Sequence, residues 1–139
     1  MPIEALRKQL LRHEGEVLHA YEDHLGYLTI GVGRLIDNRR GGGITHDEAM
    51  MLLDNDIRRV IDELESRAPW FKRLDTTRQQ AIANMAFQLG VSGLLGFRKM
   101  IGALDHGDYR KAADEAMNSR WARQTPNRAN EIADMIRKG

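Results

Sequence analysis

Apolar residues near the start of the chain recur at helical spacing. Ile3, Leu6 and Leu10 follow one another at intervals of three and four residues, and Pro2 is a suitable first-turn residue. Gly15 predicts the end of this segment, because glycine readily adopts the backbone conformation that terminates a helix. The pattern therefore predicts a first helix that ends close to this glycine.

The next stretch, residues 17–37, has a pattern typical of β-strands. Val, Tyr, Thr and Ile accumulate here, and glycines interrupt them at short intervals. We expect two or three short antiparallel strands, with the first turn between Asp23 and Gly26. The loop that follows, around Asn38 to Gly43, is a short connection that ends in three glycines.

A long helix is predicted after these glycines. Thr45 and Glu48 form the pattern of a capping box, in which each side chain accepts a hydrogen bond from the other residue's backbone N–H. An apolar stripe then continues at helical spacing as far as Pro69. Its members are Ala49, Leu53, Ile57, Val60, Ile61 and Leu64. A helix of roughly 20 residues would be about 30 Å long, enough to connect two lobes.

The rest of the chain has the pattern of a series of shorter helices. One runs from Thr77 to Gly90, and the last begins at Thr125 and Pro126, a suitable N-cap and first-turn pair. The expected core positions of the helices between them are Met100, Leu104, Ala112, Ala113 and Ala116.

This order of elements predicts an α+β fold in a single domain over residues 1–139. A small lobe, over about residues 14–65, would contain the hairpin and the linking helix. A larger, all-helical lobe would span about residues 68–139, and we expect the first helix, residues 2–12, to pack on it.

Composition excludes several classes of function. The chain has 139 residues and no cysteine, so it has no thiol nucleophile, disulfide or cysteine-based zinc site. No apolar run approaches a membrane span and the first residues do not resemble a signal peptide, so we expect a cytosolic product without stable membrane insertion. The five histidines lack metal-binding spacing, and no serine-nucleophile or nucleotide-binding motif is complete. No metal or cofactor is expected.

The net charge of +1 hides an uneven distribution. Residues 68–139 carry twelve basic and seven acidic side chains, and arginine supplies 16 of the 21 bases in the chain. This excess fits a solvated surface or a polyanionic partner such as nucleic acid, lipid or an acidic wall polymer. No known nucleic-acid-binding motif accompanies it, so nucleic acid is the weakest of these options.

Two acidic residues stand where predicted elements end. Glu14 closes the first helix, Asp23 lies at the hairpin turn, and Thr29 follows on the returning strand. Two carboxyl groups across a cleft are what glycoside hydrolysis needs, one as an acid and the other to activate water or attack the sugar. By spacing alone, ordinary turn and helix-end residues are the commoner explanation.

The sequence around these residues resembles the phage-type lysozymes, glycoside hydrolase family 24. The segment LRHEGEVLHAYEDHLGYLTIGVGRLID contains Glu14, Asp23 and Thr29 at the family's spacing. Three further blocks follow in family order, NMAFQLG, GLLGF and SRWARQTPNRANEI. The resemblance covers nearly the whole chain.

This resemblance implies a two-lobed lysozyme fold and a muramidase that cleaves the β-1,4 bond between N-acetylmuramic acid and N-acetylglucosamine in bacterial peptidoglycan. It implies that Glu14 is the general acid, that Asp23 positions or deprotonates the attacking water, and that Thr29 helps to hold that water. Arg128 matches an arginine that contacts the catalytic glutamate from the other lobe. The other matched positions are Leu35 and Phe87, which touch sugar, and Gln88, Trp121 and Gln124, which pack around the junction of the lobes.

Three positions depart from the best-known member of that family. Arg34 replaces a histidine, and Met100 and Glu115 stand at cleft positions that are polar in that member. Trp70 and Trp121 could be sugar platforms, but tryptophans in a helical packing pattern are more often core residues, and we expect both to be structural.

The resemblance implies an endolysin that works as a monomer on peptidoglycan, with no nucleic-acid partner. It would stay in the host bacterial cytoplasm until it is released to the cell wall. Two alternatives remain open. One is a lytic transglycosylase, which keeps the glutamate but needs no second carboxylate, and the other is a non-catalytic wall-binding module.

Overall fold

The computed structural model describes residues 3–22, 24–32, 34–40 and 43–139. The chain divides into two compact units, Met1–Met51 and Leu52–Gly139. The first unit contains the sheet, and the second contains the hydrophobic core. Among the described residues, no helix is both long and apolar enough to cross a bilayer.

Helix α1 (Ile3–Glu14) opens the first unit and ends where the sequence predicts. Gly15 adopts a φ of 72°, and its N–H donates to the carbonyl oxygen of Leu11 at 3.0 Å. A side chain at this position would be strained by the positive φ, so glycine is the residue that allows the chain to leave the helix here.

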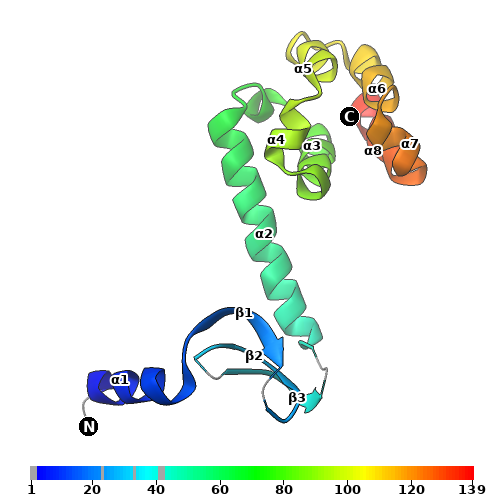
Figure 1. Cartoon of the computed structure of the whole chain (residues 1–139). Helices are drawn as coiled ribbons and strands as arrows, with labels where there is room; N and C mark the ends of the chain where they lie inside the picture. The colour runs from blue at the N-terminus through cyan, green and yellow to red at the C-terminus, as the bar shows by residue number, and fades with distance from the viewer. Residues whose placement is uncertain (1–2, 23, 33, 41–42) are drawn as a thin grey trace. The chain divides into compact units, whose positions relative to one another are not determined.

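The sheet of the first unit has three antiparallel strands in the order β1–β2–β3 (Figure 1). Strand β1 comprises Val17–Glu22, β2 comprises Tyr27–Gly31, and β3 comprises Arg34–Arg40. The third strand therefore continues into residues that the sequence pattern suggests as a connecting loop. Between β1 and β2 the chain turns through His24 and Leu25.

Helix α2 (His46–Arg67) is 22 residues long and begins with the predicted capping box. The Thr45 N–H donates to Glu48 Oε1 at 3.1 Å, and the Glu48 N–H donates to Thr45 Oγ1 at 3.2 Å. Its end, two residues before Pro69, agrees with the predicted stop, because the residue before a proline is disfavoured in helical conformation.

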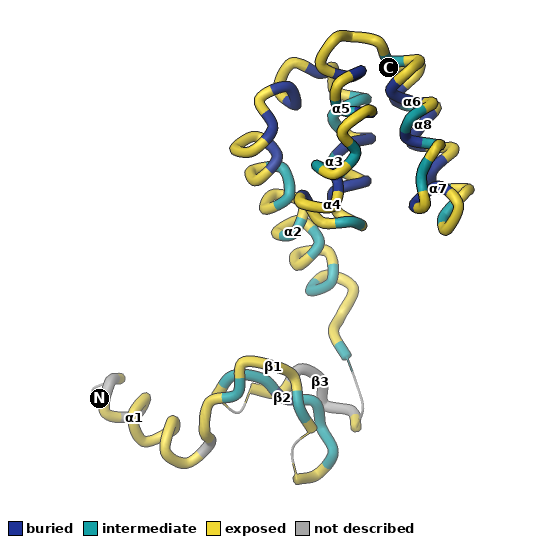
Figure 2. The backbone as a smooth tube through the Cα atoms, turned by 45° about the horizontal axis from the view of Figure 1, so that its top comes forward, coloured by how far each residue is buried: buried dark blue, intermediate teal, exposed yellow. Residues whose placement is uncertain are grey.

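The second unit continues with a short 3-10 helix and six α-helices. These are η1 (Phe71–Arg73), α3 (Thr76–Leu89), α4 (Val91–Leu95), α5 (Arg98–Asp105), α6 (Tyr109–Met117), α7 (Arg120–Gln124) and α8 (Pro126–Lys138). The buried segments of the chain gather on these helices and on the end of α2, whereas the strand residues whose burial is described are, apart from Thr29, half-buried or exposed (Figure 2). All five core positions predicted for α5 and α6 are buried.

The start of α8 differs from the prediction in one respect. Thr125 occupies the N-cap and Pro126 the first turn, but the Thr125 side chain makes no capping hydrogen bond. Its hydroxyl donates instead to the carbonyl oxygen of Trp121, at 2.9 Å. The same carbonyl oxygen also accepts from the Thr125 backbone N–H at 2.9 Å, so Thr125 closes the last turn of α7 with both its N–H and its hydroxyl.

Candidate active site

Thr29 lies in β2, the middle strand, with only 3% of its surface exposed. Its Oγ1 donates to the carbonyl oxygen of Tyr27 at 3.1 Å. A hydroxyl has one proton and two lone pairs, so this bond leaves the oxygen able to accept a hydrogen bond from another group. Thr29 therefore presents an acceptor of fixed orientation.

Strand pairing brings two predicted site positions together. Thr29 pairs with Tyr21 on β1 and with Leu35 on β3. Leu35 is 49% exposed, so an apolar surface lies on the strand beside Thr29. The last residue of β1, Glu22, pairs with Leu28, so the chain leaves β1 next to the predicted catalytic threonine.

The structure describes the backbone position of Glu14 but neither of the two predicted carboxyl groups. Glu14 is the last residue of α1, directly before the turn at Gly15, but its side chain lies outside the described part of the structure. Asp23 also lies outside the described residues. Their roles and their separation therefore stay predictions, whereas the helix end and strand end that carry them agree with the sequence pattern.

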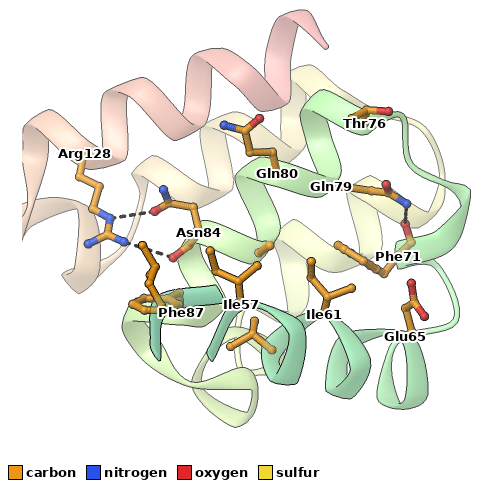
Figure 3. Close-up of a pocket in the computed structure, with 13 residues that line it drawn as sticks. Ile57, Ile61, Glu65, Phe71, Thr76, Gln79, Gln80, Asn84, Phe87 and Arg128 are labelled. Atoms are coloured by element: carbon orange, nitrogen blue, oxygen red, sulfur yellow. Dashed lines mark hydrogen bonds between the residues drawn. The ribbon is translucent and has the colours of Figure 1, made fainter. Parts of the chain in front are cut away.

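In the second unit, α2, η1, α3 and α8 line a groove of about 460 Å³ (Figure 3). Its lining is largely apolar and includes Leu53, Ile57, Val60, Ile61, Phe71, Ala83 and Phe87. Phe87 is 43% exposed, so the residue predicted to touch sugar presents an accessible aromatic surface. The charged residues of the lining are Glu65 and Arg128.

Arg128 is held by a single residue of α3. Its Nε donates to Asn84 Oδ1 at 2.9 Å, and its Nη2 donates to the Asn84 carbonyl oxygen at 3.3 Å (Figure 3). Contact between Arg128 and Glu14 stays a prediction, because the Glu14 side chain is not described. Asn84 was not recognised from the sequence as a site residue. The available signal was its place at the start of the block NMAFQLG.

Trp121 and Gln124 line a second cavity, of about 770 Å³. Gln88 is bonded to this lining from outside it: Trp121 Nε1 donates to Gln88 Oε1 at 2.9 Å. Trp121 is 5% exposed and contacts Phe97 edge to face, with ring centroids 6.1 Å apart. Burial therefore confirms that Trp121 is a core residue, and Trp70, 9% exposed, is one too.

Two of the positions that depart from the family's best-known member line the same cavity. Met100 is 1% exposed and belongs to the core, whereas Glu115 is half-buried. No cluster of three or more His, Cys, Asp or Glu residues able to hold a metal ion occurs within the described part of the chain.

Comparison of the sequence with known proteins places the chain in a family. The family described as phage lysozyme matches residues 11–137. A probable T4-type lysozyme of Dictyostelium discoideum is 31% identical over 163 aligned positions, covering 99% of this chain and 96% of that protein. The endolysin of Salmonella phage P22 is 32% identical over 126 positions, covering 86% of this chain and 83% of the endolysin.

A third relative is a much larger protein. The pre-baseplate central spike protein of Enterobacteria phage T4 is 31% identical over 163 positions, which cover 99% of this chain but 28% of the spike protein. The family match extends over most of the chain, and the α+β fold with its three-stranded antiparallel sheet is consistent with a lysozyme-like fold. The chain belongs to the phage lysozyme family.

Proposed function

We propose that the chain hydrolyses peptidoglycan at the β-1,4 bond between N-acetylmuramic acid and N-acetylglucosamine. Membership of the phage lysozyme family supports a peptidoglycan hydrolase. The name of the P22 relative, an endolysin, supports a role in host lysis, which would take the protein from the host cytoplasm to the wall. The proposed mechanism rests on the buried hydroxyl of Thr29, which donates its proton to the carbonyl oxygen of Tyr27.

That hydroxyl suits the binding of an attacking water. A water molecule that donates one proton to Thr29 Oγ1 and the other to the Asp23 carboxylate has a lone pair left for the anomeric carbon. Asp23 would take the water's proton as the new bond forms. Glu14 would give its proton to the glycosidic oxygen as the old bond breaks. Each proton is thereby accounted for, and no cofactor takes part.

Inversion at the anomeric carbon follows from this arrangement. A water molecule held between Asp23 and the sugar requires carboxyl groups about 6.5–9.5 Å apart, whereas direct attack by a carboxylate requires about 5–5.5 Å. Proton NMR of fresh product from a β-linked wall oligomer should show the α-anomer first. An initial β-anomer would show retention.

Arg128 would act on Glu14 through its charge. A cation beside a carboxyl group favours the ionised form, whereas desolvation in a cleft favours the protonated form that donates to the leaving group. The same arginine can orient the carboxyl group through its planar set of donors.

The proposal is tested by replacing Glu14 with Gln, which has nearly the same shape but cannot supply the proton. We expect turbidity loss of a permeabilised wall suspension to slow by at least about 10²-fold, since general acid catalysis contributes about 10²–10⁴-fold. Glu16→Gln is the matched control, because Glu16 is exposed and lies outside the helix.

Other outcomes would assign another function. Retention of more than about a tenth of the lytic rate in Glu14→Gln would exclude Glu14 as the general acid. Products that end in 1,6-anhydromuramic acid would identify a lytic transglycosylase. Wall binding without any cleavage by the wild type would identify a binding module.

A further inference from the structure

We propose that Glu115 is a specificity-determining residue: in the cavity beside Trp121 it selects wall peptides whose diamino acid carries a free side-chain ammonium group. The proposal rests on the function proposed above and extends it from the glycan bond to the peptide attached to the glycan. The cavity lies entirely within the second unit, Leu52–Gly139.

The cavity has the size and the mixed lining of a site for a small organic ligand. Its volume of about 770 Å³ lies within the usual range for such sites. Met100 and Trp121 are core residues, so they give the cavity an apolar wall of fixed shape. Polar side chains of Asn118, Ser119 and Gln124 complete the uncharged part of the lining.

Glu115 is the acidic residue in the described lining of this cavity. It is half-buried, and among the described residues it forms no ion pair. Withdrawing a carboxylate from water without a partner costs free energy, so a neutral side chain would be the more stable choice at this position. A ligand that brings an ammonium group to Glu115 would offset that cost.

Three basic side chains of the lining have the opposite preference. Arg98, Lys99 and Arg120 are exposed, and within the described part of the chain none of them pairs with Glu115 or with another acid. Arginine binds carboxylates well because its donors form a planar fork. An acid and bases that line one cavity without pairing suit a ligand that carries both signs of charge.

Stem peptides of peptidoglycan have this chemistry. They carry carboxylates, and a stem that is not cross-linked also carries the free ammonium group of its diamino acid. Cross-linking converts that amine into a neutral amide, so we expect the cavity to prefer stems that are not cross-linked. A purely anionic polymer fits less well, because the carboxylate of Glu115 would repel it.

The experiment uses two soluble peptides and the full chain. The peptides are N-acetyl-L-alanyl-γ-D-glutamyl-diaminopimelate with its side-chain amine free, and the same peptide with that amine acetylated. NMR titration would give the Kd of each for the wild type and for Glu115→Gln. Glu131→Gln is the matched control, because Glu131 is exposed on α8, forms no ion pair among the described residues and does not line the cavity.

We expect the wild type to bind the free-amine peptide about tenfold more tightly than the acetylated one, since a charge-assisted hydrogen bond is lost on acetylation. Glu115→Gln should bind the two peptides equally, with a melting temperature equal to or above that of the wild type. Glu131→Gln should keep the preference. Glu115→Lys should reverse it, because a cation in the cavity repels the ammonium group.

Equal binding of the two peptides by the wild type would overturn the proposal, and so would a preference that survives in Glu115→Gln. Absence of detectable binding of either peptide would overturn it as well. Failure of the proposed function is recognised separately, because these titrations need no hydrolysis. A wild type that binds the free-amine peptide selectively but leaves the wall intact would support the role of Glu115 and exclude the hydrolase.

Discussion

Among the sheet residues whose burial is described, Thr29 is the buried one, and it is polar. Threonine in a strand is expected from β-propensity alone, so its presence there says little about function. Its 3% exposure and its bond to the Tyr27 carbonyl say more, because they fix the direction in which the hydroxyl can accept. The proposed water-binding role depends on this single oxygen.

Replacing Thr29 with Val removes that oxygen and keeps the branched shape of the side chain. We expect wall hydrolysis to slow by about 10²-fold, since misplacing a reacting group can cost that much. The free energy of unfolding should fall by only about 0.5–1.5 kcal/mol, the usual net value of one hydrogen bond. Turbidity assays and urea unfolding would measure both.

Thr29→Ser is the control for this variant, because it keeps the hydroxyl and should retain most of the activity. Undiminished hydrolysis in Thr29→Val would remove Thr29 from the mechanism. An equal loss in the Ser and Val variants would mean that the methyl group, not the hydroxyl, is what matters.

The start of α3 is tied to two other helices of its unit through one arginine. Arg78 Nε donates to the Ile136 carbonyl oxygen at 2.6 Å, in the last turn of α8. Its guanidinium also lies 3.5 Å from the ring centroid of Tyr109, the first residue of α6. Asp75, the N-cap of α3, accepts from the Arg78 backbone N–H and, at 2.8 Å, from its Nη1. Arg78 thus contacts α8 and α6 and is also bonded to Asp75, the residue that caps α3.

Asp75 should make stability depend on acid pH. Partial burial acts to raise the pKa of Asp75, but the hydrogen bonds and the charge of Arg78 outweigh it and lower the pKa below the usual 3.8. A carboxyl group whose pKa is lower in the folded state stabilises the protein above its unfolded pKa, and this contribution is lost as the pH falls below about 4.

The matched variant is Asp75→Asn, which keeps an N-cap side chain but does not titrate. Wild type should be more stable than Asp75→Asn near pH 6, and the difference should shrink as unfolding is measured at successively lower pH down to about 2.5. A difference that is constant across this range would show that the Asp75 charge does not contribute.

Several of the basic side chains in residues 68–139 are neutralised by ion pairs. Arg73, Arg78 and Arg137 have carboxylate partners in Asp105, Asp75 and the pair Asp114 and Asp134. Other bases therefore carry the net positive charge, and Arg98, Lys99 and Arg120 line the cavity beside Trp121. Peptidoglycan has carboxylates on its stem peptides, so these bases are candidates for attraction to the wall.

We therefore expect wall binding to weaken as salt rises. Exposed charges are screened beyond about 8–10 Å at physiological ionic strength, so KM on insoluble wall should increase between about 0.02 and 0.3 M salt. Replacing Arg98, Lys99 and Arg120 together with Gln should raise KM at low salt and flatten its salt dependence. A KM that does not change with salt in the wild type would show that the excess is only a solvated surface.

Helix α1 has apolar side chains that its own unit leaves exposed. Contacts assign Met1–Met51 to one unit, whereas the sequence pattern suggests that helix 2–12 packs on the helical lobe. The large apolar residues of α1 whose burial is described are Ile3, Leu10 and Leu11, and all are exposed. An amphipathic helix of this kind needs an apolar partner to be stable.

The candidate site could be recognised from the sequence only in part. Glu14, Asp23 and Thr29 stood out through their resemblance to a family, since acidic residues at turns and helix ends are common for other reasons. Asn84 had only its place in the block NMAFQLG as a signal, and an asparagine within a helix gives no indication of its partner. Its bond to Arg128 spans 44 residues of sequence.

Local features were determined by the sequence itself. The helix end at Gly15 and the capping box of Thr45 and Glu48 depend on backbone conformation and hydrogen bonds within one turn, so a few neighbouring residues specify them. The buried stripes of α5 and α6 follow from helical periodicity. Tertiary structure alone decided which distant groups meet: Arg78 with the end of α8, and Arg128 with Asn84. These contacts depend on how whole helices pack, and the spacing of residues along one helix carries no information about the helix that will lie beside it.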